Sequence, residues 1–401
     1  MTRGRRSPWL ANAALAIGSL AVFAGAAELL ARAFDLRPAS GTALANPPWL
    51  GDRWLLRDDY RDEFANAGQL ARYYDLYEWD RYLFYRLRPD TRLSLLDVFA
   101  PPAARERTRW QAATNSRGFR TPEFEDRRAA DAIRVVALGD SSTFGWGVED
   151  GETYPAQLRA ALAARLDIPP ERVEVIDLGV PGYSTFQGLT LLERVGLSLK
   201  PDLVIWSYLS NDGAATGEDD AATYAHRLGA TGALLEVLHR SRAFEALEGW
   251  IAVARSRIRP PAPPDARDPS QRNVASYDVA RENVRAAVEA AQRAGVPIAL
   301  LGECIRGAPA ELMADVARET GAPHLDAAQL LDASIPVIAG DPRFAADRER
   351  IAARYGADEL ASHPRWLAFL PDRCHPNALG HRLVAEALAD LAAGMLPKPT
   401  R

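Results

Sequence analysis

A serine and a histidine are the residues of this chain best placed to carry out chemistry, because each stands in a short motif of polar groups. Ser141 follows Asp140 directly after an apolar run, and His375 stands three residues after Asp372. A carboxylate in the same loop can accept a hydrogen bond from the histidine Nδ1–H, which leaves Nε2 free to take a proton from a serine. The order Ser, Asp, His therefore predicts a catalytic triad of Ser141 as nucleophile, His375 as general base and Asp372 as the acid that orients it.

Two further motifs carry groups that could bind a developing negative charge. Gly182 lies in a glycine-rich and proline-containing turn, where the missing Cβ lets the backbone approach a ligand. A turn that needs a positive φ would explain this glycine equally well. Asn211 can direct its side-chain NH₂ into the same cleft, although Asn-Asp-Gly is also an ordinary turn sequence.

The hydrophobic pattern from residue 133 onward predicts the elements that must position these motifs. Short apolar runs, which we interpret as strands, are Ile133–Leu138, Val173–Leu178, Leu203–Leu209, Pro297–Leu301 and the weaker His324–Leu325. The segments between and after them, which we interpret as helices, are Tyr154–Leu166, Phe186–Leu199, Val279–Arg293, Glu311–Thr320 and Ala378–Ala393. This alternation predicts an α/β domain with a doubly wound parallel sheet. The motifs follow strand ends or precede the last helix, so we expect them at the carboxyl edge of the sheet.

Taken together, the motifs resemble those of the SGNH (GDSL-type) hydrolase superfamily. The matching blocks, in chain order, are Gly139-Asp140-Ser141, Gly182, Asn211-Asp212 and Asp372-x-x-His375. The resemblance covers about residues 133 to 393 and implies a flavodoxin-like three-layer sandwich. In addition, residues 115–120 (Asn-Ser-Arg-Gly-Phe-Arg) resemble the lead-in of membrane-anchored bacterial members.

The resemblance also implies an oxyanion hole built from the backbone N–H groups of Ser141 and Gly182 and the side chain of Asn211. One position departs from the superfamily pattern, which often has glycine two residues before the asparagine. Here that residue is Leu209. We expect the leucine to alter the backbone of the oxyanion pocket.

The activity implied by the resemblance is that of a serine ester hydrolase acting on acyl esters, with small groups such as acetyl on cell-envelope polysaccharide as the expected substrate. An O-acyltransferase would use the same triad, with a sugar hydroxyl in place of water. A non-catalytic glycan-binding or scaffold protein would predict a degraded triad. We expect neither a cofactor nor a metal, because the remaining histidines have no ligand spacing with acidic or thiol residues.

The first 35 residues predict a membrane-targeting segment, either an anchor or a signal peptide. Three arginines within the first six residues precede an apolar stretch from Trp9 to Ala27, which is long enough to cross the hydrocarbon core as a helix. By the positive-inside rule, the chain that follows would lie outside the cytoplasm, on the periplasmic or outer face. A cleaved signal peptide is the alternative, because residues 24–26 (Ala-Gly-Ala) fit a cleavage site.

The rest of the chain is expected to divide into a lead-in segment at residues 36–130 and a hydrolase-type domain at 131–397. The lead-in carries a dense aromatic run from Tyr73 to Tyr85, which could stack on sugars or pack on the neighbouring domain. Residues 213–276 interrupt the domain with a predicted helical piece at Ala233–Ile258 and a proline-rich linker. This insertion could be a lid over the site or a surface addition.

Composition excludes several classes of protein. With 401 residues, 48% of them hydrophobic, and a net charge of −5, the chain is globular and has no nucleic-acid-binding charge pattern. Two cysteines are too few for a disulfide framework or a four-thiolate zinc site. Cys374 nevertheless lies between Asp372 and His375, and Cys304 follows the fourth predicted strand. Outside the cytoplasm they could form a disulfide, provided that their Cα atoms lie within about 7 Å.

Overall fold

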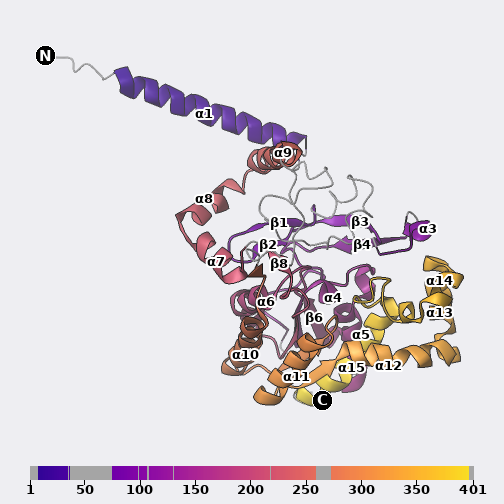
Figure 1. The fold of residues 1–401 in the computed structure, drawn as a ribbon. Helices are drawn as coiled ribbons and strands as arrows, with labels where there is room; N and C mark the ends of the chain where they lie inside the picture. Colours follow the sequence, from indigo (N-terminus) through magenta and orange to yellow (C-terminus); the bar gives the residue numbers. More distant parts are fainter. Residues whose placement is uncertain are drawn as a thin grey trace.

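Five parallel strands form the central sheet, with the first of them near its middle. They are β5 (Ile133–Gly139), β6 (Val173–Asp177), β7 (Leu203–Ser207), β10 (Ile298–Gly302) and β11 (His324–Asp326). Their order across the sheet is β11-β10-β7-β5-β6, and every neighbouring pair is parallel. The predicted doubly wound α/β fold is confirmed (Figure 1). The computed structural model describes residues 8–34, 36, 75–97, 99–105, 108–129, 131–216, 218–258 and 272–396.

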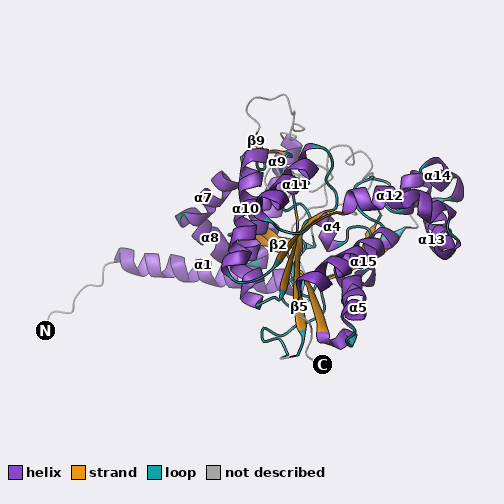
Figure 2. Cartoon of the chain, turned by 90° about the horizontal axis from the view of Figure 1, so that it is seen from below, coloured by secondary structure: helices purple, strands orange, loops and turns teal. Residues whose placement is uncertain are grey.

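Helices cover both faces of the sheet (Figure 2). Alternate residues of β5 point to opposite sides, so Val136 and Leu138 lie in one hydrophobic cluster while Val135 and Ala137 lie in the other. The helices that close the first cluster are α6 (Thr185–Leu191), α10 (Tyr277–Arg293) and α11 (Ala308–Thr320). Those that close the second are α5 (Tyr154–Leu166), α12 (Ala327–Gly340) and α15 (Ala378–Met395). Burial on both faces explains why the strands read as continuous apolar runs.

All five predicted helices of the domain are present, with some differences in extent. The segment predicted as one helix from Phe186 is α6 followed by a π-turn at Leu192–Gly196 and a 3₁₀ turn at Leu197–Leu199. Between β11 and the last helix, three further helices were not predicted, namely α12, α13 (Ala345–Tyr355) and α14 (Ala357–Ser362). α12 contains Pro336, which obscured its helical pattern, and the other two are short.

The insertion after β7 forms three helices in place of the single predicted piece. They are α7 (Asp220–Leu228), α8 (Ala230–Leu238) and α9 (Arg242–Ile258). The break between α8 and α9 falls at Ser241. Its Oγ accepts a hydrogen bond from Phe244 N at 3.2 Å and so caps the start of α9. The two-residue strands β8 (Ala215–Thr216) and β9 (Arg272–Asn273) pair at the base of the insertion.

The lead-in segment packs on the sheet domain through two antiparallel hairpins. One hairpin is β1 (Tyr77–Asp80) with β2 (Phe84–Leu87), and the other is β3 (Arg92–Leu96) with β4 (Arg109–Ala113), which flank the short α3 (Pro102–Arg105). In the aromatic run, Tyr77 and Tyr85 are buried, and Tyr85 Oη donates to the carbonyl of Pro181 at 3.0 Å. Tyr85 is therefore packed against the turn that carries Gly182, and Tyr77 packs on Tyr85. Tyr73 and Tyr74 lie outside the described residues.

Helix α1 (Pro8–Ala33) extends away from the rest of the molecule (Figure 1). Within it, Trp9–Ala33 is long and apolar enough to cross a membrane, and none of its most apolar window is buried in the protein. Among the described residues, its last turns contact the body, where Ala31 is buried and the helix lies against α9. The helix fits either a membrane anchor or a signal segment.

Candidate active site

The predicted triad residues meet at the carboxyl edge of the sheet although 234 positions separate serine from histidine. His375 Nε2 lies 2.7 Å from Ser141 Oγ, and His375 Nδ1 is hydrogen bonded to Asp372 Oδ2. Asp372 Oδ1 also accepts from the backbone N–H of Cys374 and His375, at 3.1 and 3.2 Å. The aspartate thus holds both the imidazole ring and its loop, and the ring presents its second nitrogen to the serine.

Ser141 is the first residue of the short helix α4 (Ser141–Phe144), which starts where β5 ends. Asp140 caps this helix by accepting from Ser142 N at 3.0 Å. Gly139 cannot be replaced by a larger residue, because a Cβ there would lie 1.9 Å from Thr143 Oγ1. The tight strand-to-helix turn therefore places the serine hydroxyl above the sheet edge.

The asparagine and glycine motifs converge on the same turn. Asn211 Nδ2 donates to Asp140 Oδ2 at 3.2 Å and to the carbonyl of Tyr183 at 3.0 Å. One amide group thus links the residue before Ser141 to the residue after Gly182. Gly182 has φ +82°, which favours glycine and agrees with the turn interpretation, whereas its part in an oxyanion hole stays a prediction. Because both N–H groups of the amide are engaged, donation to an oxyanion would require one of them to turn.

Leu209 adopts the conformation that a glycine would favour. Its φ is +101°, although its side chain is buried in the core. Leu209, which stands where the superfamily often has glycine, thus has a positive φ. This conformation is strained for a residue with a side chain. Our expectation of an altered backbone finds no support in this φ, because Leu209 keeps a glycine-like conformation.

The loop that carries the histidine is held at both ends. Leu370 N donates to His375 O at 2.8 Å, and the side chain of Asn377 caps α15 by accepting from Gly380 N at 2.9 Å. Within the loop, Cys374 forms a disulfide with Cys304, and the two Cα atoms lie 4.8 Å apart. The disulfide considered from the sequence is therefore present, and it joins the loop that carries His375 to the end of β10.

Two aromatic rings flank the histidine. Phe99 stacks on His375 with 5.7 Å between ring centroids, and Trp146 lies at 6.5 Å. Phe99 comes from the lead-in segment and is only partly buried. Neither ring was singled out from the sequence, because the residues around them form no motif.

A family comparison can now be set beside this geometry. The model of the GDSL-like lipase/acylhydrolase family matches residues 137–383, which contain Ser141, Gly182, Asn211, Asp372 and His375. The chain belongs to the GDSL-like lipase/acylhydrolase family. It is therefore an ester hydrolase, and the predicted resemblance to SGNH hydrolases is confirmed.

Solved structures of similar proteins share little sequence with this acylhydrolase. The lipase/acylhydrolase from Enterococcus faecalis is 15% identical with a TM-score of 0.37, covering 67% of this chain and 99% of that chain. An α/β hydrolase from the metagenome of Lake Arreo is 18% identical with a TM-score of 0.37, covering 67% and 99%. A catalytic mutant of an acetylxylan esterase from Geobacillus stearothermophilus is 15% identical with a TM-score of 0.34, covering 69% and 100%. No curated protein matches the chain.

The electrostatics of the acylhydrolase site act on the histidine in opposite directions. Burial lowers the pKa of His375, whereas the negative charge of Asp372 and its hydrogen bond raise it. The effects of Asp372 outweigh the effect of burial, so the pKa of His375 lies above its ordinary value of 6.5. Contact with a carboxylate thus makes the imidazole a stronger base than it would be in water.

Two buried acids, Glu303 and Asp212, lie near the active-site turns. Glu303 Oε2 accepts from Thr143 Oγ1 at 3.1 Å and from Ser207 Oγ at 3.0 Å, while Oε1 has no hydrogen-bond partner among the described residues. Burial raises the pKa of Glu303 to about 8, and burial raises the pKa of Asp212 to about 7. Burial thus favours the neutral form of both groups, which limits the negative charge near the site.

Arg120, from the Asn-Ser-Arg-Gly-Phe-Arg segment, supports the far end of the nucleophile helix. Its Nη1 donates to the carbonyls of Phe144 and Gly145 at 2.9 and 2.6 Å. The remaining N–H groups donate to the carbonyls of Gln111 and Val148 and to Asp150 Oδ1, at 2.6, 2.7 and 2.8 Å. Four hydrogen bonds of this buried guanidinium thus hold backbone carbonyls at and near the end of α4, and the fifth pairs it with Asp150. The segment was noted from the sequence, but the role of its last arginine was not.

The described residues contain one group of metal-ligand types, which is Asp372, Cys374 and His375. Cys374 is in a disulfide and offers no thiolate, while the other two side chains are hydrogen bonded to each other. The arrangement is suited to proton transfer between Ser141 and the histidine.

Proposed function

We propose that this acylhydrolase is a membrane-anchored serine esterase that removes small acyl groups, such as acetyl, from glycans of the cell envelope. The observation that carries the catalytic part is the hydrogen-bonded chain from Asp372 through His375 to Ser141, with 2.7 Å between His375 Nε2 and Ser141 Oγ. This separation lets the imidazole take the serine proton without any rearrangement of the loop.

In the proposed reaction, Ser141 Oγ attacks the ester carbonyl carbon while its proton passes to His375 Nε2. The tetrahedral intermediate collapses, the C–O bond to the alcohol breaks, and the alcohol takes the proton from His375. Water then attacks the acyl-serine while its proton passes to His375, the bond between the acyl carbon and Ser141 Oγ breaks, and Oγ takes the proton back from His375 as the carboxylic acid leaves. Asp372 stabilises the imidazolium in both steps.

The oxyanion would be bound by the backbone N–H of Ser141, the backbone N–H of Gly182 and the Nδ2 of Asn211. Support comes from the hydrogen bonds that join Asn211 to the residues next to the other two. When the substrate oxygen becomes negative, it would compete with the carbonyl of Tyr183 for one N–H of the amide. A donor of this kind contributes about 10²–10³ in turnover.

The membrane part of the proposal rests on α1 and on the basic residues before it. An uncleaved helix with arginines at its start would leave the hydrolase domain outside the cytoplasm. The Cys304–Cys374 disulfide supports a location outside the cytoplasm, because disulfides persist in oxidising compartments. Fusion of alkaline phosphatase to the C-terminus, which is active only outside the cytoplasm, tests the orientation.

A fluorophosphonate probe tests the nucleophile in the full chain. We expect peptide mapping to find the label on Ser141 in the wild type and in Ser142→Ala, and no label in Ser141→Ala. Ser142 is a matched control, because it is the adjacent hydroxyl and its Oγ has no hydrogen-bond partner among the described residues. A label on another serine in a folded Ser141→Ala protein would overturn the triad.

The acyl group and the acceptor need a second measurement. Acetylated glycan is incubated with the enzyme, with and without an unacetylated glycan, and both free acetate and newly acetylated glycan are quantified. Hydrolysis predicts free acetate in both reactions. Transfer of acetyl groups to the added glycan would instead establish the O-acyltransferase alternative, which uses the same residues.

A further inference from the structure

Helix α9 has its apolar side facing outward. Leu247, Trp250 and Ile251 recur at the spacing of one helix face and are 43% to 54% exposed. The inward side carries Glu245, which is buried and lies 3.8 Å from Arg242. A helix on the surface of a water-soluble domain normally shows the opposite arrangement, so this face is built for contact with something apolar.

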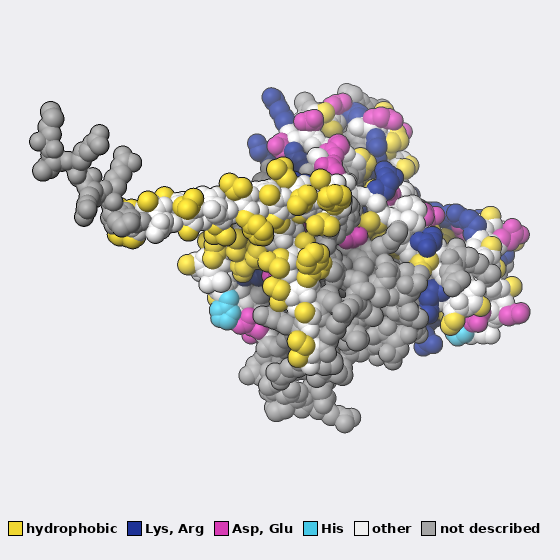
Figure 3. All heavy atoms as spheres, turned by 90° about the horizontal axis from the view of Figure 1, so that it is seen from above, with side chains coloured by type: hydrophobic (Ala, Val, Ile, Leu, Met, Phe, Trp, Pro, Cys, Tyr) yellow, Lys and Arg dark blue, Asp and Glu magenta, His cyan; other side chains and the backbone are white. Residues whose placement is uncertain are grey.

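Helix α8 extends the same apolar surface. Leu234 and Val237 are 59% and 60% exposed, and Leu228 at the end of α7 is 47% exposed. Seen from above, hydrophobic side chains gather beside α1 in a continuous patch on the face from which that helix leaves the body (Figure 3). We call Leu234, Val237, Leu247, Trp250 and Ile251 the α8–α9 apolar face.

The start of α9 is attached to the last turns of α1. Glu28 of α1 accepts hydrogen bonds from Ser241 Oγ at 2.7 Å and Ala243 N at 3.1 Å, so its carboxylate caps α9. Arg32 pairs with the same carboxylate at 2.6 Å and donates to the carbonyl of Arg240 at 3.4 Å. Because Glu28 follows the apolar stretch of α1 directly, this junction places the beginning of α9 at the level where α1 leaves the hydrocarbon core.

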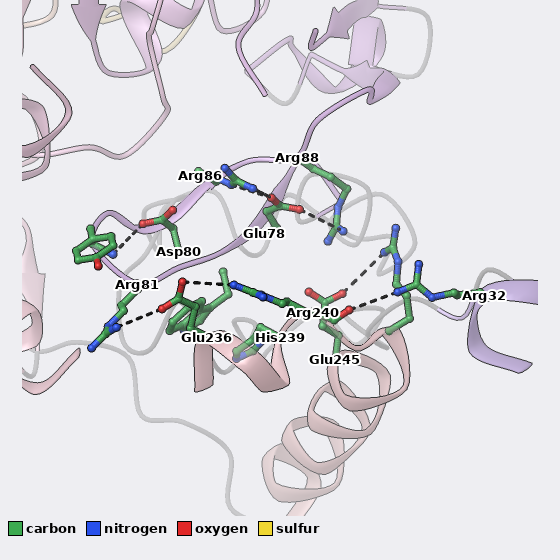
Figure 4. A pocket seen from close by; sticks show the side chains of 13 residues that line it. Arg32, Glu78, Asp80, Arg81, Arg86, Arg88, Glu236, His239, Arg240 and Glu245 are labelled. Atoms are coloured by element: carbon green, nitrogen blue, oxygen red, sulfur yellow. Dashed lines mark hydrogen bonds and ion pairs between the residues drawn. The ribbon is translucent and has the colours of Figure 1, made fainter. Parts of the chain in front are cut away.

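Charged side chains gather beside the same junction, in a cavity of about 480 Å³ between α1, the β1–β2 hairpin and α8–α9 (Figure 4). Its six arginines are Arg32, Arg81, Arg86, Arg88, Arg240 and Arg242, which outnumber its four acids, Glu78, Asp80, Glu236 and Glu245. The side chains of Arg32 and Arg240 are 60% and 76% exposed. Arginines beside an apolar surface with a tryptophan match the phosphate and carbonyl level of a bilayer.

We propose that the α8–α9 apolar face docks on the outer surface of the bilayer that α1 crosses. The apolar side chains enter the interface, while Arg32 and Arg240 face lipid phosphates. The proposal rests on the membrane anchoring proposed above, and the continuity of the face with α1 is what selects lipid as the occupant. Docking orients the hydrolase domain, because the insertion that carries α8 and α9 begins just after Asn211, in the loop that follows β7.

A lipid-depth measurement on the full chain tests this proposal. The native cysteines form a disulfide and leave no free thiol, so one introduced cysteine can carry a polarity-sensitive NBD dye. The labelled variants are Val237→Cys and Ile251→Cys on the face, Leu20→Cys in α1, and Val337→Cys as the control. Val337 is an exposed apolar residue of α12, 52% exposed, and lies outside the proposed face. Each protein is placed in vesicles of phosphatidylethanolamine and phosphatidylglycerol that contain doxyl-labelled lipid.

We expect blue-shifted emission and several-fold quenching by the doxyl lipid at positions 237, 251 and 20, and neither effect at 337. If the dyes at positions 237 and 251 behave like the dye at 337 while the dye at position 20 is quenched, the docking proposal is wrong, and α1 is still a membrane anchor. If 20 is not quenched, the anchor is wrong and docking fails with it. Protection of 237 and 251 in detergent, together with a dimer in sedimentation, would show that a second copy covers the face. Fluorophosphonate labelling of Ser141 in the same samples reports on the esterase independently.

Discussion

The disulfide between Cys304 and Cys374 ties the end of strand β10 to the loop that carries His375, with 4.8 Å between the two Cα atoms. Cys374 is the residue immediately before His375, and its N–H donates to Asp372 Oδ1 at 3.1 Å. The bridge therefore restrains the segment on which the proposed general base depends. The restraint is covalent and independent of the hydrogen bonds in the loop.

Removing this bridge should lower both stability and turnover. The double variant Cys304→Ser/Cys374→Ser frees a loop that spans 70 positions, and we expect a loss of about 4 kcal/mol in the free energy of unfolding. Turnover should fall more than KM rises, because the loop moves while the rest of the cleft stays in place. Urea denaturation and ester kinetics measure the two effects. An unchanged kcat in the folded double variant would show that the bridge has no part in positioning His375.

The activity should fall at acidic pH with an apparent pKa above 6.5. His375 must be neutral to accept the serine proton, and its pKa in the folded protein is raised above 6.5, so activity is lost as the pH falls through that raised value. In Asp372→Asn the charge that raises the pKa is gone and burial remains, so the acid limb should move to lower pH. We also expect kcat to fall about ten-thousand-fold. A pH profile of kcat/KM with an unmoved limb in this variant would contradict the pairing.

Arg120→Lys should weaken the nucleophile turn. A lysine ammonium has three donors where Arg120 uses five, so at least two buried acceptors lose their hydrogen bonds, at a cost of about 2–4 kcal/mol. Arg117→Lys in the same segment is the matched control. Its ion pair with Asp126 is exposed, so we expect a change below about 0.5 kcal/mol. Thermal unfolding compares the variants, and equal losses in both would exclude the proposed support.

At position 209, glycine should be tolerated better than alanine. Both substitutions remove the buried leucine side chain and its packing, so both should destabilise the fold. Alanine keeps the strain of a positive φ, whereas glycine relieves it, and we expect Leu209→Gly to be more stable than Leu209→Ala by about 1 kcal/mol. Denaturant titrations of the two variants decide the order. The reverse order would mean that φ at this position carries no strain.

The contribution of Glu303 to stability should decline as the pH rises from about 5 to 8. Its pKa in the folded protein is about 8, above the value of about 4.3 for an unfolded chain, so stability present below the lower value is lost as the pH rises through the higher one. Asp212, with a pKa of about 7, acts in the same direction. Glu303→Gln should make the slope of unfolding free energy against pH more positive in this range, because the negative contribution of Glu303 is removed. An identical slope in the variant would show that Glu303 is ionised throughout.

The sequence predicted the sheet well, because strands buried on both faces leave continuous apolar runs such as Leu203–Ser207. It predicted α5 with the correct bounds, since Thr153 caps its start and the apolar residues repeat along one face. It did not predict α12, where Pro336 interrupts the pattern, nor the contact of Phe99 with His375. That contact joins residues far apart in the chain, and no local pattern reports it.

The sequence by itself determined the fold class, the family motifs and the apolar helix at the start of the chain, because each depends on residue types at short spacing. Tertiary structure alone decided the pairing of Cys304 with Cys374, the five hydrogen bonds of Arg120 and the attachment of α9 to Glu28. It also decided that Leu209 keeps a glycine-like backbone. These features depend on how distant segments pack, where burial and a limited supply of hydrogen-bond partners select one arrangement that local sequence cannot encode.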